Sequence, residues 1–345
     1  MRATLIIAIL SVISIGFSGA AHASDQALIH ASEKGDIETV TNLLLAGNDV
    51  NQVGKDGFSA LIKASWQGHT EVVKLLLVAN ADASQVIRGG ISALIAASLQ
   101  GDPEIVKLLL VANGEVNHAN LDGVSALIAA SAEGHPKIVT LLLAANAEVN
   151  QANSVGRSAL MAASGQGHSE IVKLLLSANA DVNKVSHDGM SALIKASEDG
   201  YTEIVKLLLS ADANVNHATS EGLSALMAAA ARDYTEIVNL LLVADANVNQ
   251  MTADGISSLG VASQAGHIKT VEFLLAANVN VNQAGSDGIS ALVVASYFGH
   301  TEIVKLLLAA NADVHQVIDD GSTALTVATE NGHVDIVKLL STHQP

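Results

Sequence analysis

The sequence predicts an all-α solenoid of stacked helix-turn-helix units joined by β-hairpin-like finger loops. Three observations predict it. Glycines recur with a constant step of 33 residues from Gly57 to Gly321, and each is followed by a similar pair of apolar segments. Half of the 345 residues are hydrophobic, but only 2 % are aromatic. A fixed period of this length is typical of supersecondary units that stack in a line. Aliphatic residues without aromatics suit many small packed elements better than one large core.

The first helix of each unit begins after a serine and ends at a glycine. Ser59, for example, precedes Ala60-Leu61-Ile62, and serine is a good N-cap residue before an Ala/Leu-rich helix. Gly68 ends this helix, because the left-handed backbone that closes a helix suits glycine best. In one unit Asp233 replaces this glycine, and we expect the turn to survive there because Asp tolerates the left-handed region.

The second helix of each unit is strongly apolar, as in residues 70–77 or 301–308. Its apolar residues cover so much of its circumference that neighbours must bury it on several sides. The residues that end it all tolerate a left-handed backbone: Gly47, Asn80, Asn113, Asn146, Asn179, Asp212, Asp245, Asn278 and Asn311. An Asp-Gly pair such as Asp122-Gly123 then predicts a tight hairpin turn before the next unit.

Taken together, these residues resemble the ankyrin repeat, which reads roughly D-G-x-T-P-L-H-x-A-A-x-x-G-H-x-E-I-V-x-L-L-L-x-x-G-A-D-V-N. The resemblance covers about residues 25–343 and implies an ankyrin repeat domain over residues 24–345 with about ten units. It departs where Thr-Pro-Leu-His becomes Ser-Ala-Leu, usually followed by Ile, Met or Val, and where Asn or Asp follows the second helix. We expect an N-terminal cap at about residues 25–56, repeats from about residues 57, 90, 123, 156, 189, 222, 255 and 288, and a C-terminal cap from about residue 321.

Residues 1–23 read as a cleaved secretory signal peptide. Arg2 gives a positive start, residues 5–15 are mostly apolar, and Ala21-His22-Ala23 fits a cleavage site. The alternative is an uncleaved anchor, but the run is short for the roughly 20 residues that a spanning helix needs. We therefore expect export to a bacterial periplasm or secretion, with no stable membrane insertion after cleavage. The absence of cysteine and of Asn-x-Ser/Thr sequons agrees with that route.

Charge and motifs argue against several classes of function. The net charge of −17 disfavours nucleic acid and anionic lipid as partners. No phosphate-binding loop, His-Glu-x-x-His or Gly-x-Ser-x-Gly motif occurs. One histidine series recurs once per unit, which places its members too far apart to share a metal: His69, His135, His168, His267, His300 and His333. The resemblance implies that they stabilise turns. We therefore expect no catalytic residues, no metal, no cofactor and no enzyme activity.

Binding residues are expected where the repeats differ from one another. Four of the seven aromatic residues after the predicted cleavage site stand at such variable positions, and aromatic side chains are frequent interface anchors. They indicate two zones, with an acidic pair between them along the chain that suits a basic partner. The candidates are Phe58, Trp66, Ile91 and Leu99; Glu198 and Asp199; and Ile289, Tyr297 and Phe298. Packing between adjacent fingers is the alternative role for the aliphatic members.

The predicted function is therefore a non-catalytic scaffold that binds a partner protein on its concave face and finger loops and is itself monomeric. A chaperone-like or protective accessory role for an exported enzyme is the alternative, since an apolar concave stripe can also hold unfolded chains. An enzyme is the remote alternative.

Overall fold

A computed structural model describes residues 21–87 and 89–343 and, within them, twenty α-helices. The chain divides into two compact units, Met1–Asp181 and Val182–Pro345. The helices of the first unit are α2 (Ala21–Lys34), α3 (Ile37–Leu45), α4 (Ala60–Trp66), α5 (Thr70–Val78), α6 (Ala93–Gln100), α7 (Pro103–Val111), α8 (Ala126–Glu133), α9 (Pro136–Ala144), α10 (Ala159–Gly165) and α11 (Ser169–Ser177). Those of the second unit are α12 (Ala192–Glu198), α13 (Thr202–Ser210), α14 (Ala225–Ala230), α15 (Thr235–Val243), α16 (Ser258–Ala265), α17 (Ile268–Ala276), α18 (Ala291–Phe298), α19 (Thr301–Ala309), α20 (Ala324–Glu330) and α21 (Val334–Thr342).

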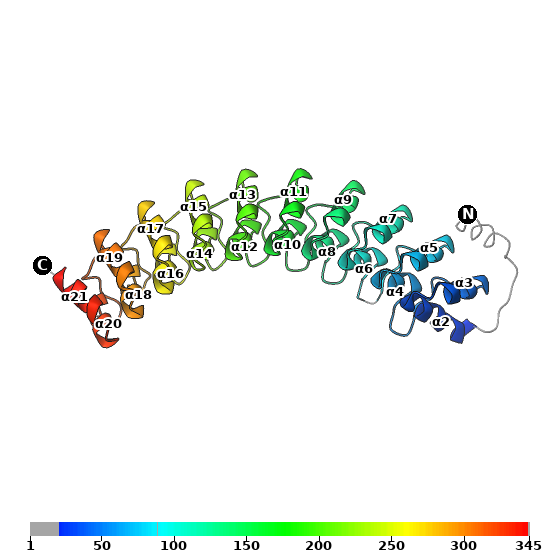
Figure 1. Cartoon of the computed structure of the whole chain (residues 1–345), viewed down its shortest axis with the longest axis horizontal. Coiled ribbons are helices and arrows are strands. Elements are labelled where there is room, and N and C mark those ends of the chain that lie inside the picture. Colours follow the sequence, from blue (N-terminus) through cyan, green and yellow to red (C-terminus); the bar gives the residue numbers. More distant parts are fainter. Residues whose placement is uncertain (1–20, 88, 344–345) are drawn as a thin grey trace. The chain divides into compact units, whose positions relative to one another are not determined.

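Within each unit the helices come in pairs that form two layers (Figure 1). The first helices of successive pairs pack against one another, as α4 does against α6 and α16 against α18. The second helices do the same, as α7 does against α9 and α17 against α19. Every inner helix therefore buries one side within its own pair and others against its neighbours, which confirms the stacked helix-turn-helix fold predicted from the 33-residue period.

The predicted helix ends are confirmed at residue level. The Ser59 side chain accepts a hydrogen bond from the Ile62 amide and begins α4. Gly35 ends α2 with φ +71°, and a Cβ there would lie 2.7 Å from the His69 ring, so the position needs glycine for both backbone and space. Asp233 adopts φ 57° and keeps the turn. The Asn and Asp residues that follow the second helices all have φ between 58° and 64°.

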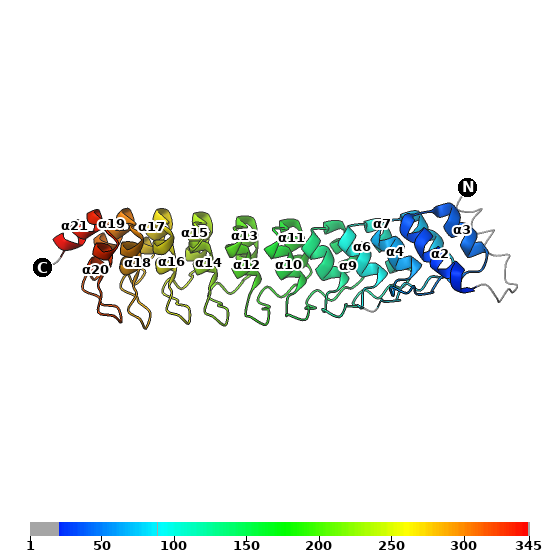
Figure 2. The ribbon, with the colours of Figure 1, turned by 90° about the horizontal axis from the view of Figure 1, so that it is seen from below.

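Up to α18, the loops between pairs form short hairpins held by single antiparallel bridges, such as Val53 with Ser59 and Met251 with Ser257. In the first of them, the Gly54 amide donates to the Phe58 carbonyl at 2.8 Å. Within each unit the hairpins project from the same side of the helical layers (Figure 2). This arrangement confirms the β-hairpin-like finger loops.

Side chains in two positions connect successive repeats. Where a histidine precedes a second helix, its Nε2 approaches a carbonyl at the end of the first helix of the previous repeat, as His168 does to Ala132 at 3.1 Å and His300 to Gln264 at 3.0 Å. In the hairpins, an asparagine Oδ1 accepts the backbone amide of the next loop, as Asn249 accepts from Asn280 at 2.7 Å. The histidines therefore stabilise turns and join repeats, as the resemblance implied.

Buried serines form a further regular position near the end of the first helix. Their hydroxyl oxygens are buried and have no hydrogen-bond partner within the described part of the chain: Ser32, Ser65, Ser98, Ser131, Ser164, Ser197, Ser263 and Ser296. At the same position α14 carries Ala230, which is also fully buried. The small side chain is thus required by close packing, whereas the hydroxyl group is not.

The predicted signal peptide falls almost wholly on residues 1–20, which lie outside the described residues. Helix α2 begins at Ala21, within the predicted cleavage site. Among the helices that the structure describes, none combines the length and the apolar character that crossing a membrane requires.

Candidate functional site: an apolar groove in the second unit

The site arises from one departure from the repeated sequence. The third residue after the N-cap serine of the first helix is large and apolar in most repeats. Six of these residues are almost fully buried: Ile62, Ile95, Ile128, Met161, Ile194 and Met227. In α16 the same position is Gly260. A Cβ placed there would meet one atom within 4 Å, the Ser257 Oγ at 3.4 Å. The missing side chain therefore leaves space beside α16 that no neighbour fills.

This space is part of a groove of about 530 Å³. Helices α16, α18 and α20 and the hairpin loops that precede them form its walls. Its apolar lining consists of Ile256, Gly260, Ile289, Ala291, Val293, Val294, Tyr297, Phe298, Ile318 and Val327. Volume and lining are within the range of protein sites that bind small molecules or anchor side chains.

Two aromatic side chains stand at the mouth of the groove, at the end of α18. Tyr297 is 52 % exposed and Phe298 is 47 % exposed. Their ring centroids are 5.0 Å apart in an edge-to-face arrangement, and Phe298 also stacks on His300 at 6.2 Å. The Tyr297 carbonyl lies 2.9 Å from His333 Nε2. The two rings are therefore held in place while much of their surface faces solvent, as expected of an interface anchor.

The rim of the groove carries polar and acidic groups. Asp254 and Asp287 occupy the same position in successive hairpins, and Gln264 and Gln283 lie near them in the lining. An Asp287 Oδ1 accepts the Ile289 amide at 3.0 Å, which keeps this carboxylate at the turn. Neither Asp254 nor Asp287 forms an ion pair with a cationic side chain of residues 21–87 or 89–343. The site therefore combines an apolar interior with two carboxylates that have no cationic partner among the residues that the structure describes.

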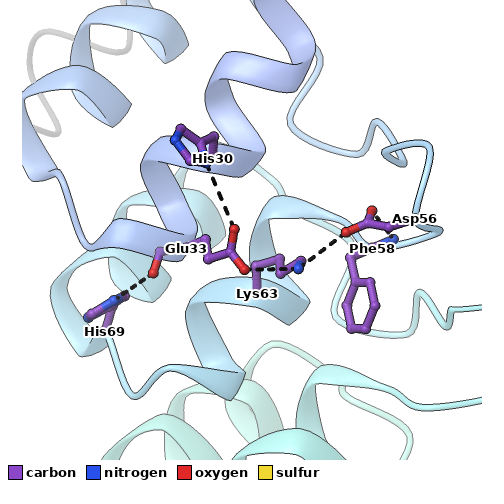
Figure 3. Close-up of polar contacts among 6 residues, drawn as sticks. All are labelled: His30, Glu33, Asp56, Phe58, Lys63 and His69. Atoms are coloured by element: carbon purple, nitrogen blue, oxygen red, sulfur yellow. Dashed lines mark hydrogen bonds and ion pairs between the residues drawn. The ribbon is translucent and has the colours of Figure 1, made fainter.

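The first predicted zone, in the N-terminal unit, is arranged differently (Figure 3). The Lys63 ammonium lies 4.4 Å above the Phe58 ring centroid. The same ammonium forms ion pairs with Glu33 at 2.9 Å and Asp56 at 3.2 Å. Phe58 is half-buried and is covered by its own neighbours. A cation–π contact within about 6 Å stabilises such an arrangement.

The charges around Lys63 shift its pKa and that of Asp56. Partial burial alone would lower the pKa of Lys63, but Glu33 and Asp56 outweigh it and raise the pKa above its ordinary value. Partial burial alone would raise the pKa of Asp56, but the Phe58 amide and the Lys63 ammonium hold this pKa below its ordinary value. Both shifts favour the charged forms, so the cluster is an intramolecular ion-pair network at neutral pH.

The other predicted residues of the first zone are half-buried. Trp66 ends α4, Leu99 lies in the last turn of α6, and Ile91 precedes α6. Helices α4 and α6 pack side by side. Ile62, at the position of Gly260, is only 1 % exposed and fills the space that is open in the second unit.

The predicted acidic pair is partly neutralised by its own helix. Lys195 forms ion pairs with Glu198 at 2.9 Å and with Asp199 at 3.1 Å. Partial burial alone would lower the pKa of Lys195, but the two carboxylates outweigh it and raise the pKa. A basic partner of this pair would therefore compete with Lys195.

Of the nine residues predicted from the sequence, the structure brings Ile289, Tyr297 and Phe298 together in the lining of the groove. Sequence reasoning did not select Gly260, Ile256 or Val294, which line it as well. The signal for Gly260 is visible, because Ser-Ser-Leu-Gly replaces the usual Ser-Ala-Leu-Ile in this repeat. A search for large variable side chains does not notice a side chain that is missing.

Side chains that could hold a metal ion do not cluster in the described part of the chain. No group of three or more His, Cys, Asp or Glu side chains in residues 21–87 and 89–343 has the arrangement of a metal site. The recurrent histidines approach backbone carbonyls of the preceding repeat. The groove itself offers apolar contact and negative charge, which suits binding.

Comparison with known families agrees with this geometry. The model of the family described as ankyrin repeats (3 copies) matches residues 12–88, 93–186, 178–252 and 259–345. No curated protein matches the chain. Ankyrin repeats are in general scaffolds for protein–protein interaction. The period, the helix pairs, the hairpin loops and the family match together show that the chain belongs to the ankyrin repeat family.

Proposed function

We propose that the protein is an exported, monomeric, non-catalytic scaffold that binds a partner protein through the first-helix side and the hairpin loops of its second unit. The observation that carries this proposal is the exposed edge-to-face pair of Tyr297 and Phe298 at the mouth of the groove. Exposed aromatic side chains on a rigid frame bind a partner with little loss of conformational freedom. The net charge of −17 supports a protein partner over nucleic acid.

Affinity capture from the exported fraction of the native host tests the proposal. The full chain is compared with a Tyr297→Ala/Phe298→Ala variant, and we expect one stoichiometric partner whose recovery falls about tenfold or more in the variant. Phe273→Ala is the matched control, because Phe273 is an aromatic residue of similar exposure, 38 %, on the second helix α17. Thermal unfolding of both variants should remain close to that of the parent protein.

The outcomes separate the alternatives. Equal recovery with the parent and the double variant would contradict the assignment of Tyr297 and Phe298 as anchors. Recovery of many unfolded proteins in place of one partner would favour the chaperone-like role. Absence of the chain from the exported fraction would contradict the predicted localisation.

A further inference from the structure

We infer that the groove at Gly260 binds a basic, extended segment of the partner polypeptide, with one large apolar side chain in the hollow and Lys or Arg residues facing Asp254 and Asp287. This inference rests on the proposed function and identifies the chemistry of the partner segment. It begins from Gly260, where most other repeats place a buried Ile or Met.

The hollow accepts an external side chain because no residue of the described ranges occupies it. A Cβ at Gly260 would have one neighbour within 4 Å, at the ordinary contact distance of 3.4 Å. Ile289, Val293 and Val294 provide apolar walls, and Tyr297 and Phe298 extend them to the surface. The volume of about 530 Å³ exceeds what one missing isoleucine leaves, so a Leu, Met or Phe side chain and part of its backbone fit.

The charge of the partner segment follows from the rim. Asp254 and Asp287 line the groove and have no cationic partner in the described part of the chain. The same hairpin position is acidic throughout the second unit, where it carries Asp188, Glu221, Asp254, Asp287 and Asp320. A negative row beside an apolar hollow is complementary to a cationic peptide and repels a segment of like charge.

The distance between successive hairpins defines how far apart the basic residues of the bound segment should be. Neighbouring packed helices lie about 8–10 Å apart, and an extended chain advances about 3.3 Å per residue. Basic residues about three positions apart in an extended segment therefore reach successive hairpins. The apolar side chain stands between them, above Gly260.

A second copy of this chain is a poorer occupant. Its net charge of −17 opposes approach to the same acidic rim. Nucleic acids and anionic lipids carry the same sign of charge. A cationic polypeptide is the occupant that satisfies both the hollow and the rim.

Selection of a random peptide library displayed on phage against the full-length chain tests the inference. We expect enriched peptides in which one large apolar residue lies between Lys or Arg residues. For a synthetic peptide of the enriched sequence, Gly260→Ile should weaken binding by about tenfold or more, because the usual isoleucine then fills the hollow. Asp254→Asn/Asp287→Asn should weaken binding at low salt and flatten its salt dependence.

Gly260→Ala is the matched control. It removes the glycine but adds only a Cβ with ordinary contacts, so it should weaken binding much less than Gly260→Ile does. Gly260→Ile should unfold at the same or a higher temperature, which separates a filled groove from a misfolded chain.

Three results would overturn the inference: no enrichment, enrichment of peptides without basic residues, or equal binding to the parent and Gly260→Ile. The proposed function fails by a different result, namely native capture that does not depend on Tyr297 and Phe298. If native capture depends on these rings but survives Gly260→Ile, the scaffold function stands and the groove inference is wrong.

Discussion

The region around Phe58 and the groove around Gly260 come from equivalent parts of the repeat, yet one is closed and the other is open. In the region around Phe58, Lys63 lies over the ring and forms ion pairs with Glu33 and Asp56. The buried Ile62 side chain occupies the space that is open at Gly260. At the second, Gly260 leaves that space empty. The aromatic pair of α18 stands beside it with about half of its surface exposed.

The difference shows that an aromatic residue at a variable position does not by itself create an open groove. The side chains around the aromatic ring decide its exposure. They either cover the ring, as Lys63 does at Phe58, or leave an open space beside it, as Gly260 does near Phe298. Val294 and Val327 line the groove at positions equivalent to Lys63, so no charged side chain reaches across it from there. A few side chains therefore distinguish the closed repeat from the open one.

Substitution at the position shared by Ile62 and Gly260 should change stability most. Ile62→Gly removes a fully buried side chain and adds a helical glycine, so the free energy of unfolding should fall by about 3–5 kcal/mol. Trp66 is the only tryptophan in the chain. Urea unfolding followed by its fluorescence should therefore show the loss directly. A loss below about 1 kcal/mol would contradict the close packing described for Ile62.

The reciprocal change should stabilise. Gly260→Ile replaces a helical glycine and buries an aliphatic side chain in existing space, so the free energy of unfolding should rise by about 1–2 kcal/mol. Circular dichroism during urea unfolding measures it across all helices. A fall in stability would mean that the walls of the groove do not admit the side chain.

Removing the cation of the closed region should have a smaller, pH-dependent effect. Lys63→Met keeps much of the side-chain volume but breaks the ion pairs, and stability at pH 7 should fall by about 1 kcal/mol or less because Glu33 and Asp56 are partly exposed. Trp66 fluorescence during unfolding provides the measurement.

The sign of the pH dependence follows from the two pKa shifts. The pKa of Asp56 is lower in the folded protein than in the unfolded chain, where it is near 3.8. Asp56 therefore stabilises the fold at pH values above 3.8, and this stability is lost as the pH falls through the pKa of the folded state. The raised pKa of Lys63 contributes stability below 10.5, and this is lost as the pH rises through the folded value. The parent and Lys63→Met should therefore differ most near neutral pH and converge below pH 3.8. A constant difference would contradict the ion-pair account.

A further small effect should be equal in both regions. Ser65 in α4 and Ser296 in α18 bury hydroxyl oxygens that have no partner in the described residues. Ser65→Ala and Ser296→Ala should each raise the free energy of unfolding by about 0.5–1 kcal/mol, since alanine is the better helix former and Ala230 shows that it fits. Differential scanning calorimetry resolves such shifts. Destabilisation by either change would show that the hydroxyl has a partner after all.

Three residues of the groove lining were selected from the sequence. Ile289, Tyr297 and Phe298 were selected because repeats differ there, and they line the groove. Gly260 was missed because it contributes space and no side chain. The position of Lys63 over Phe58 was not predicted. Lys63 is held there by Glu33, which is 30 residues away in the chain and approaches it only when α2 packs against α4.

The sequence by itself determined the helix pairs, their ends and the hairpin loops of this protein. Serine caps and left-handed Gly, Asn and Asp residues fix the helix ends through their own local backbone. The 33-residue period places these residues at the same positions in successive repeats. Only the tertiary structure decided which apolar residues stay exposed. Exposure depends on what a neighbouring repeat places opposite each side chain, as Ile62 and Gly260 show in equivalent positions.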